Sequence, residues 1–279
     1  MESSRGAAGN GSVPVKVIVE GRSQVLDRAG AYREFKKKGY IVFERALDPE
    51  LVGRMYQVWE EYFGPFQAEK PDLKRLLMHL PFKEPLYHPQ FLENPHVMAI
   101  TDRVLGKKCL CGYFGSETAL PGCDFMQWHF DLMFLTKMTW LNGPLSFANK
   151  LLGSLGYIYG IQVSVPLVDS HEKNAPFEIE PATNRFSLKK RPHETILMPA
   201  GSLIVRDIRN MHRGTPHRGD SPRPFLSLVY LRSWVPKWKM PEIPEEVYQA
   251  LPEKSKSLLR EANIGQSVPS PGEWAKRPR

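Results

Sequence analysis

The sequence is poor in the features that mark secreted, membrane-spanning and nucleic-acid-binding proteins. Only three of the 279 residues are cysteine, and an odd, small number of thiols argues against a disulfide-stapled fold. No apolar run is long enough to cross a bilayer, and the Gly- and Ser-rich first residues lack the apolar segment of a signal peptide. No zinc-finger, helix-turn-helix or aromatic RNA-binding motif occurs. We therefore expect a cytoplasmic protein that binds neither membranes nor nucleic acid.

The composition that remains is that of a globular protein with a large core. Apolar residues make up 42% of the chain and aromatic residues 11%, which is enough to build one sizeable domain. The formal net charge is +8, which favours an anionic small molecule as partner. The densest basic cluster, Lys36–Lys38, is typical of a solvated helix end and carries no functional argument.

Helix signals dominate the first part of the chain. Asp27 and Gly39 bracket one expected helix, and the strand 40–43 follows. Asp48 and Pro49 start a second helix, whose apolar face we expect to end at Gly64. We divide the chain into a flexible tail (1–25), a single domain (26–240) and a C-terminal extension (241–279) with a short helix near 255–262. Asn94-Pro95 opens a further helix, which ends at Gly106.

Strand signals dominate from Lys107 onward. Short apolar runs alternate with Gly, Pro, Asn and Asp at residues 109–114, 125–135, 157–168, 195–198, 203–205 and 225–231. This spacing predicts a mainly β sandwich or barrel, and the earlier helices are expected to pack on it. Residues 136–156 interrupt the pattern and are interpreted as an insertion that affects specificity.

A polar triplet stands out within one of the apolar runs. Alternation along a strand would place Gln127, His129 and Asp131 on one face, where burying them without partners would be costly. Alone, the pattern is better explained by His129 and Asp131 hydrogen bonding to each other on a half-exposed face.

A second histidine changes the balance. His212 follows another short strand, and Arg223 begins the strand after it. Two histidines and one carboxylate on a β scaffold are the ligand set of non-haem iron(II) oxygenases, which leaves three positions open. Arg223 offers a planar fork suited to a carboxylate, although a surface ion pair would explain an isolated arginine equally well.

Several segments together resemble the phytanoyl-CoA dioxygenase family of iron(II)/2-oxoglutarate oxygenases. The similarity spans about residues 30 to 235 and rests on REFKKKGYIVFERALDPELVGRM, NPHVMAITDRVLG, QWHFD, NAPFEIEPATN and PAGSLIVRDIRNMHRGTPHRGDSPRPFLSLVY. The fourth segment departs from the family pattern at Ala175 and at residues 182–184.

The resemblance implies a double-stranded β-helix, or jelly roll, that holds iron inside one mouth. It assigns the metal to His129, Asp131 and His212, and 2-oxoglutarate to Arg223, with O2 as the oxidant. His217 competes with His212 but occupies a position that is usually Asn in the family, so His212 is preferred.

Two further residues have predicted roles in binding the oxo acid. Gln127 lies on the expected ligand face, and Thr215 follows the distal histidine. Candidates for the pocket wall are Tyr113, Phe134, Trp140, Tyr157 and Gln162, although most such aromatic residues belong to an ordinary core.

The expected reaction is oxidation of an unactivated C–H bond of a small metabolite, with release of succinate and CO2. The carboxylate of Asp131 favours oxygenation over halogenation, because related halogenases carry a small residue at that position. Desaturation, ring closure and epimerisation use the same three ligands and stay open. Alternatives are hydroxylation of an acyl thioester, a cupin-type metalloenzyme that needs no oxo acid, and a binding module without catalysis.

Overall fold

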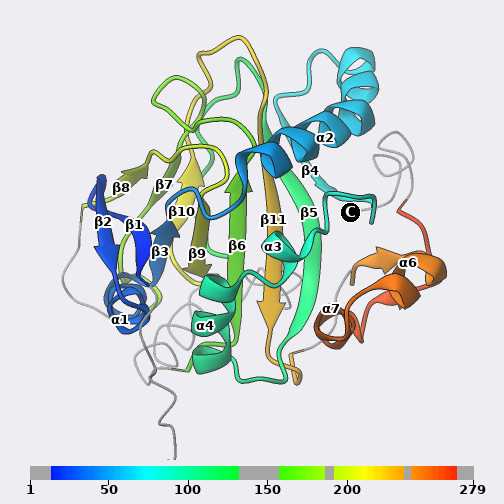
Figure 1. Ribbon diagram of the computed structural model, residues 1–279. Coiled ribbons are helices and arrows are strands. Elements are labelled where there is room, and N and C mark those ends of the chain that lie inside the picture. Colours follow the sequence, from blue (N-terminus) through cyan, green and yellow to red (C-terminus); the bar gives the residue numbers. More distant parts are fainter. Residues whose placement is uncertain (1–13, 132–156, 186–191, 236–239, 269–279) are drawn as a thin grey trace, which may run out of the picture.

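A large antiparallel sheet forms the framework of the computed structural model, which describes residues 14–131, 157–185, 192–235 and 240–268. The order of its eight strands is β2-β1-β3-β9-β6-β11-β5-β4 (Figure 1). The strands are β1 (Val15–Val19), β2 (Arg22–Leu26), β3 (Tyr40–Phe43), β4 (Arg75–His79), β5 (Leu110–Ala119), β6 (Gly160–Pro166), β9 (Leu203–Asp207) and β11 (Arg223–Leu231). Apart from β1 with β2 and β4 with β5, neighbours in this sheet are not consecutive strands, so the sheet brings distant residues onto one surface.

Two smaller sheets complete the β structure. Strands β7 (Phe177–Ile179), β8 (Glu194–Ile196) and β10 (His212–Gly214) pair in the order β10-β7-β8. Strands β12 (Glu242–Ile243) and β13 (Asn263–Ile264) form a short parallel pair. The mainly β prediction is therefore confirmed.

Four helices precede β5, and their start signals match the sequence prediction. They are α1 (Arg28–Lys38), α2 (Pro49–Glu69), α3 (Pro89–Leu92) and α4 (Pro95–Val104). Asp27, Asp48 and Asn94 each accept a hydrogen bond from a main-chain N–H of the first turn, which satisfies donors that have no partner within the helix. Gly39 ends α1 in the left-handed region, with φ of 80°.

Two predicted boundaries were wrong. Helix α2 continues through Gly64 and Pro65 to Glu69, and the buried side chain of Phe66 keeps this last stretch on the core. Residues 15–26, most of which were assigned to a flexible tail, form the β1–β2 hairpin and pair with β3. Burial of Val15 and Val17 against the core explains why this hairpin is ordered.

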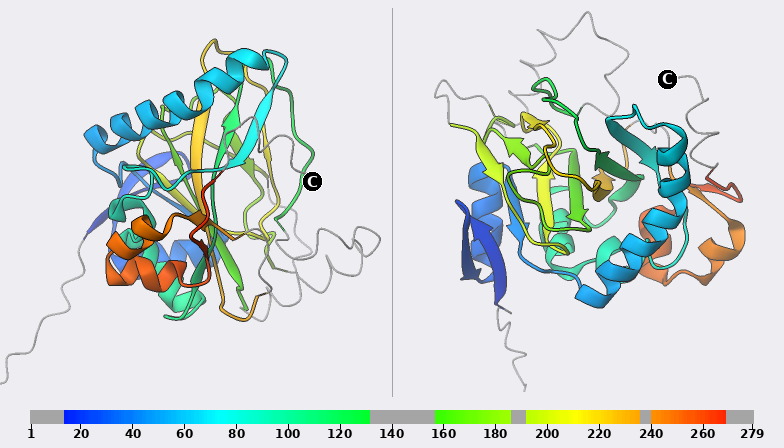
Figure 2. Two further views of the ribbon diagram at one scale, coloured as in Figure 1. Left: turned by 90° about the vertical axis from the view of Figure 1, so that its right-hand side faces the viewer. Right: turned by 90° about the horizontal axis from the view of Figure 1, so that it is seen from above.

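The large sheet has an apolar outer face, whereas its inner face is partly apolar and partly polar. Figure 2 shows the helices on one side of this sheet and the β10-β7-β8 sheet on the other. The main core lies under the helices, where Phe35, Met55, Trp59 and Phe63 are buried. The opposite face carries Gln162, Arg206 and Arg223 toward the smaller sheet. Charged residues therefore line the space between the two sheets.

The C-terminal segment packs on the same core. Helix α6 (Glu245–Ala250) precedes α7 (Glu253–Leu259), slightly upstream of the predicted 255–262, and Leu258 and Leu259 are buried. Among the described residues, no helix is both long and apolar enough to span a membrane. The predicted insertion at 136–156 and the pocket-wall candidate Phe134 lie outside the described residues.

Candidate active site

Main-chain pairing brings the two predicted histidine ligands together. His129 and His212 form an isolated antiparallel bridge, with N–H to O=C distances of 3.0 and 2.9 Å in the two directions. Such a directly opposed pair places side chains next to each other on one face, and the centroids of the two imidazole rings are 4.2 Å apart. The backbone itself thus fixes the spacing of these side chains.

Asp131 completes the cluster. Its main-chain N–H donates to the Ile208 carbonyl at 2.8 Å, which holds this end of the segment against the turn after β9. Its Oδ1 lies 4.0 Å from Nε2 of His129, and its Oδ2 lies 3.7 Å from Nε2 of His212. One potential ligand atom from each residue lies within 4.8 Å of the other two, close enough for a single ion to contact all three.

Both histidines present Nε2 to the cluster because their other ring nitrogen is engaged. Nδ1 of His129 lies 2.8 Å from the carbonyl oxygen of Gln127, and Nδ1 of His212 lies 2.9 Å from that of Asn210. A carbonyl only accepts, so each Nδ1 carries the proton and each Nε2 keeps its lone pair. Such outer hydrogen bonds orient metal-binding histidines in known sites.

Charge and burial keep two of the three candidate ligands deprotonated. Burial opposes ionisation of Asp131, but the adjacent Arg206 guanidinium and then His212 outweigh it and lower the pKa of Asp131 to about 2. Burial, reinforced by Arg206, lowers the pKa of His212 to about 3. A divalent ion requires a carboxylate and a neutral imidazole, and these are the forms present at neutral pH.

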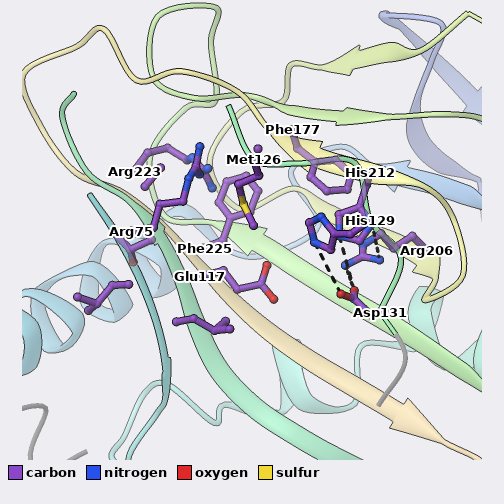
Figure 3. A pocket seen from close by; sticks show the side chains of 15 residues that line it. Arg75, Glu117, Met126, His129, Asp131, Phe177, Arg206, His212, Arg223 and Phe225 are labelled. Carbon is purple, nitrogen blue, oxygen red and sulfur yellow. Dashed lines mark hydrogen bonds and ion pairs between the residues drawn. The ribbon is translucent and has the colours of Figure 1, made fainter. Parts of the chain in front are cut away.

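A cavity of about 160 Å³ connects this cluster with two arginines (Figure 3). His129, Asp131 and His212 lie at one end, and Arg75 and Arg223 lie at the other. The remaining lining residues include aromatic, aliphatic and charged side chains: Leu76, Leu77, Glu117, Thr118, Ala119, Met126, Phe177, Arg206, Gly214 and Phe225.

Strand register explains the arginine end. Arg75 on β4 and Arg223 on β11 are both direct partners of Ala119 on the intervening strand β5. Directly paired residues point to the same face, so two guanidinium groups flank one small side chain. Figure 3 shows both groups together, away from His129 and Asp131.

Neither arginine has a carboxylate partner in the part of the chain that the structure describes. Arg223 donates to the carbonyls of Asn174 and Ala175 at 3.3 and 2.9 Å, and its guanidinium carbon lies 3.9 Å from the centre of the Phe225 ring. Arg75 donates to the carbonyls of Asp124 and Thr215, both at 2.8 Å. Main-chain dipoles therefore orient two cations without neutralising them.

The pKa of Arg223 reflects both its burial and the nearby positive charge of Arg75. Burial and then the charge of Arg75 lower the pKa of Arg223 to about 10, and Glu117 only partly offsets them. Arg223 still carries its charge at neutral pH. Two adjacent cations of this kind, one buried (Arg223) and one half-buried (Arg75), favour a bound anion.

Three other predicted residues lie outside this arrangement. The side chain of Gln127 is exposed and does not line the cavity. The hydroxyl of Thr215 donates to the Pro176 carbonyl at 2.7 Å, and Thr215 contributes its own carbonyl to Arg75. Nδ1 of His217 accepts from the N–H of Gly219 at 3.1 Å, and His217 is not part of the three-residue cluster. Roles for Gln127 and Thr215 in binding the oxo acid stay predictions.

Sequence analysis did not single out Arg75, Glu117 or Arg206, although all three line the cavity. Gln162, a predicted wall candidate, contacts Arg206. The available signal was weak: Arg206 is a charged residue that directly follows three apolar residues in the strand sequence LIVRD.

Solved structures similar to this one include two non-haem enzymes and one protein with nickel and 2-oxoglutarate bound. The chain is 14% identical to the α-ketoglutarate-dependent epimerase SnoN from nogalamycin biosynthesis, covering 74% of this chain and 83% of that one, with a TM-score of 0.53. HygX from Streptomyces hygroscopicus, solved with nickel and 2-oxoglutarate bound, gives 11% identity, coverage of 78% and 90%, and a TM-score of 0.53. The chain is 16% identical to the non-haem monooxygenase ThoJ, which was solved as a nickel complex; the match covers 72% of this chain and 77% of that one, with a TM-score of 0.52.

The jelly-roll prediction is confirmed. At these identities the similarity establishes the fold alone, and fold does not determine function. The sequence matches no protein-family model. The specific resemblance to the phytanoyl-CoA dioxygenase family therefore stays a prediction.

Proposed function

We propose that this protein is an iron(II)- and 2-oxoglutarate-dependent oxygenase that oxidises a C–H bond of a small molecule. The observation that carries the proposal is one cavity with a two-histidine, one-carboxylate cluster at one end and, at the other, two arginines that have no carboxylate partner among the described residues. A short oxo acid with a carboxylate at each end matches this polarity. Solved structures of the same fold include one with nickel and 2-oxoglutarate bound, which supports the proposal.

The donor set fits iron(II). Two imidazole nitrogens and one carboxylate, His129, His212 and Asp131, leave coordination positions for a cosubstrate and O2. When bound, the metal and the oxo acid supply the oxidising chemistry, in which O2 converts 2-oxoglutarate to succinate and CO2 while the substrate is oxidised. The contribution of the chain is to bind, orient and shield.

Arg223 holds the far carboxylate of the oxo acid. Its Nε and Nη2 bonds to main-chain carbonyls fix the guanidinium plane, and burial strengthens its interaction with an anion. Arg75 adds a second positive charge across Ala119. Phe225, beneath Arg223, excludes water from one face of the guanidinium.

The substrate class is less restricted than the reaction class. The fold hosts an epimerase and a monooxygenase among its solved members, so the product is set by the substrate that the walls admit. We propose that the protein hydroxylates a small metabolite, and that it acts in a biosynthetic pathway as the epimerase SnoN does. The net charge of the chain, +8, favours an anionic substrate.

Succinate formation from 2-oxoglutarate, with iron(II) and candidate substrates, tests the proposal. We expect wild-type protein to form succinate, and Asp131→Ala and Arg223→Ala to reduce it to background. Arg232→Ala is a matched control, because Arg232 also bonds main-chain carbonyls, those of Ile158 and Val104, but does not line the cavity. Absence of both iron binding and succinate from wild-type protein contradicts the proposal. Unchanged activity of Asp131→Ala contradicts the ligand assignment.

A further inference from the structure

A third arginine, Arg206, lies beside the metal-ligand cluster. Its side chain is 4% exposed on β9, and the ring of Phe177 covers it, with 5.5 Å between the guanidinium carbon and the ring centre. Its Nη2 donates to Oδ2 of Asp131 at 2.5 Å and also to Oε1 of Gln162 at 2.5 Å. An Nη2 carries two hydrogens, so both are used by these two acceptors.

A chain of hydrogen bonds continues from Arg206 to a half-buried acid, Glu117. Gln162 is the direct partner of Arg206 on the neighbouring strand β6, and its Nε2 donates to Oε1 of Glu117 at 2.5 Å. The side chains of Gln162 and Glu117 meet across β11 at Ser227, whose small size leaves room for the bond. The amide is therefore held in one orientation, with its oxygen toward Arg206.

This arrangement treats the two oxygens of Asp131 differently. Both oxygens face a histidine of the cluster, Oδ1 at 4.0 Å from Nε2 of His129 and Oδ2 at 3.7 Å from Nε2 of His212. Oδ2 also accepts the Arg206 hydrogen bond, whereas Oδ1 receives no hydrogen bond from a described residue. A carboxylate can bind a metal through one oxygen or through both. The guanidinium competes with the metal for Oδ2 alone.

We propose that Arg206 is a positioning residue that keeps Asp131 a one-oxygen metal ligand, with Gln162 and Glu117 fixing the direction of its guanidinium. The inference rests on the proposed function, because it assumes that His129, Asp131 and His212 hold a metal. If both oxygens of Asp131 bound the metal, one of the three open positions would be lost. The oxo acid needs two of these positions and O2 needs one, so Arg206 protects cosubstrate binding rather than metal binding.

The competing explanation is that Arg206 only neutralises Asp131 and Glu117. Arg206→Lys separates the two explanations, because it keeps the charge but offers a point donor in place of the fixed planar fork. Arg206→Met removes both the charge and the fork at similar length. Arg232→Met is the matched control for loss of a guanidinium bonded to carbonyls outside the cavity.

The test measures cobalt(II) affinity, the visible absorption of the cobalt-loaded protein, and 2-oxoglutarate affinity of that form without O2. For Arg206→Met we expect cobalt affinity to change by less than about tenfold and 2-oxoglutarate affinity to fall by about 10- to 100-fold. The absorption spectrum changes in the same variant, reporting the altered ligand set. Arg206→Lys recovers only part of the 2-oxoglutarate affinity, and Arg232→Met matches wild type in all three measurements.

Three results overturn the inference. Wild-type 2-oxoglutarate affinity and spectrum in Arg206→Met show that the guanidinium does not set the ligand mode of Asp131. Full recovery by Arg206→Lys shows that charge alone matters. Loss of cobalt binding in Arg206→Met, with binding retained in Arg232→Met, shows that Arg206 is needed for the metal itself. Failure of wild-type protein to bind cobalt is a different result, because it contradicts the proposed function before any variant is considered.

Discussion

The two ends of the cavity are built in different ways. At the cluster end, main-chain hydrogen bonds join His129 to His212, and side-chain bonds fix the protonated nitrogens of both rings and Oδ2 of Asp131. At the other end, Arg75 and Arg223 are fixed by carbonyl groups but have no carboxylate partner among the described residues. One end is organised to receive a cation, and the other carries charge that an anion must balance.

The difference indicates which end depends on the ligand. The negative charge of Asp131 is already compensated by Arg206, so the cluster keeps its shape before a metal arrives. The charge of Arg223 is not compensated locally, and Arg75 lowers its pKa further after burial. Variants at the two ends should therefore have separable effects on metal binding and on oxo-acid binding.

The largest effect is expected at the cluster end. His212→Ala removes one of the ligand atoms and should abolish tight nickel or iron binding, whereas His217→Ala should leave it intact because His217 lies outside the cluster. Calorimetric titration with nickel checks both variants. Equal loss of metal affinity in the two variants would break the assignment of His212 over His217.

A smaller effect is expected at the arginine end. Arg75→Met should weaken 2-oxoglutarate binding by about tenfold, because it removes either a charge-assisted contact with the oxo acid or the attraction of a nearby positive charge. It should leave nickel affinity unchanged. Lys74→Met is the control, because Lys74 is the adjacent cation on the chain but does not line the cavity. Equal weakening in both variants would mean that general charge, rather than the placement of Arg75, matters.

The smallest effect is expected from Gly214→Ala. A Cβ at Gly214 would lie 2.6 Å from Nη1 of Arg75, so the guanidinium must shift away from its present position. We expect 2-oxoglutarate affinity to fall by about two- to threefold, a cost well under 1.4 kcal/mol. Gly53→Ala, with nothing within 4 Å of the added Cβ, should leave binding unchanged and stabilise α2 by up to about 1 kcal/mol. Unaltered oxo-acid affinity in Gly214→Ala would show that Arg75 can move without consequence.

Local signals predicted the elements that local chemistry controls. Asp27, Asp48 and Asn94 marked helix starts because capping involves residues within one turn. The end of α2 was missed because tertiary burial of Phe66 outweighs the local signals of Gly64 and Pro65.

The site shows the same division between local and long-range information. His129, Asp131, His212 and Arg223 were predicted and line one cavity, whereas Arg75 and Arg206 were not singled out. Their positions depend on which strands are neighbours: β4 beside β5, and β9 beside β6. Alternation within one strand carries no information on that register.

The prediction for Gln127 assumed regular alternation through residues 125–135. In the described part of that stretch, His129 is the one residue that forms a β-bridge, and its partner is His212. Without a continuous strand, alternation does not place Gln127 on the face of His129 and Asp131, and its side chain is exposed.

The most direct test of the central claim is to measure the affinity of 2-oxoglutarate for the wild-type protein and for Arg223→Met. Each protein is measured with nickel and without it, and O2 is excluded throughout. Our account predicts tight binding only when nickel and Arg223 are both present, because one ligand must contact both ends of the cavity. Loss of either should weaken binding by at least about tenfold. Equal affinity with and without nickel, or in wild type and Arg223→Met, would contradict the claim that the two ends form one site.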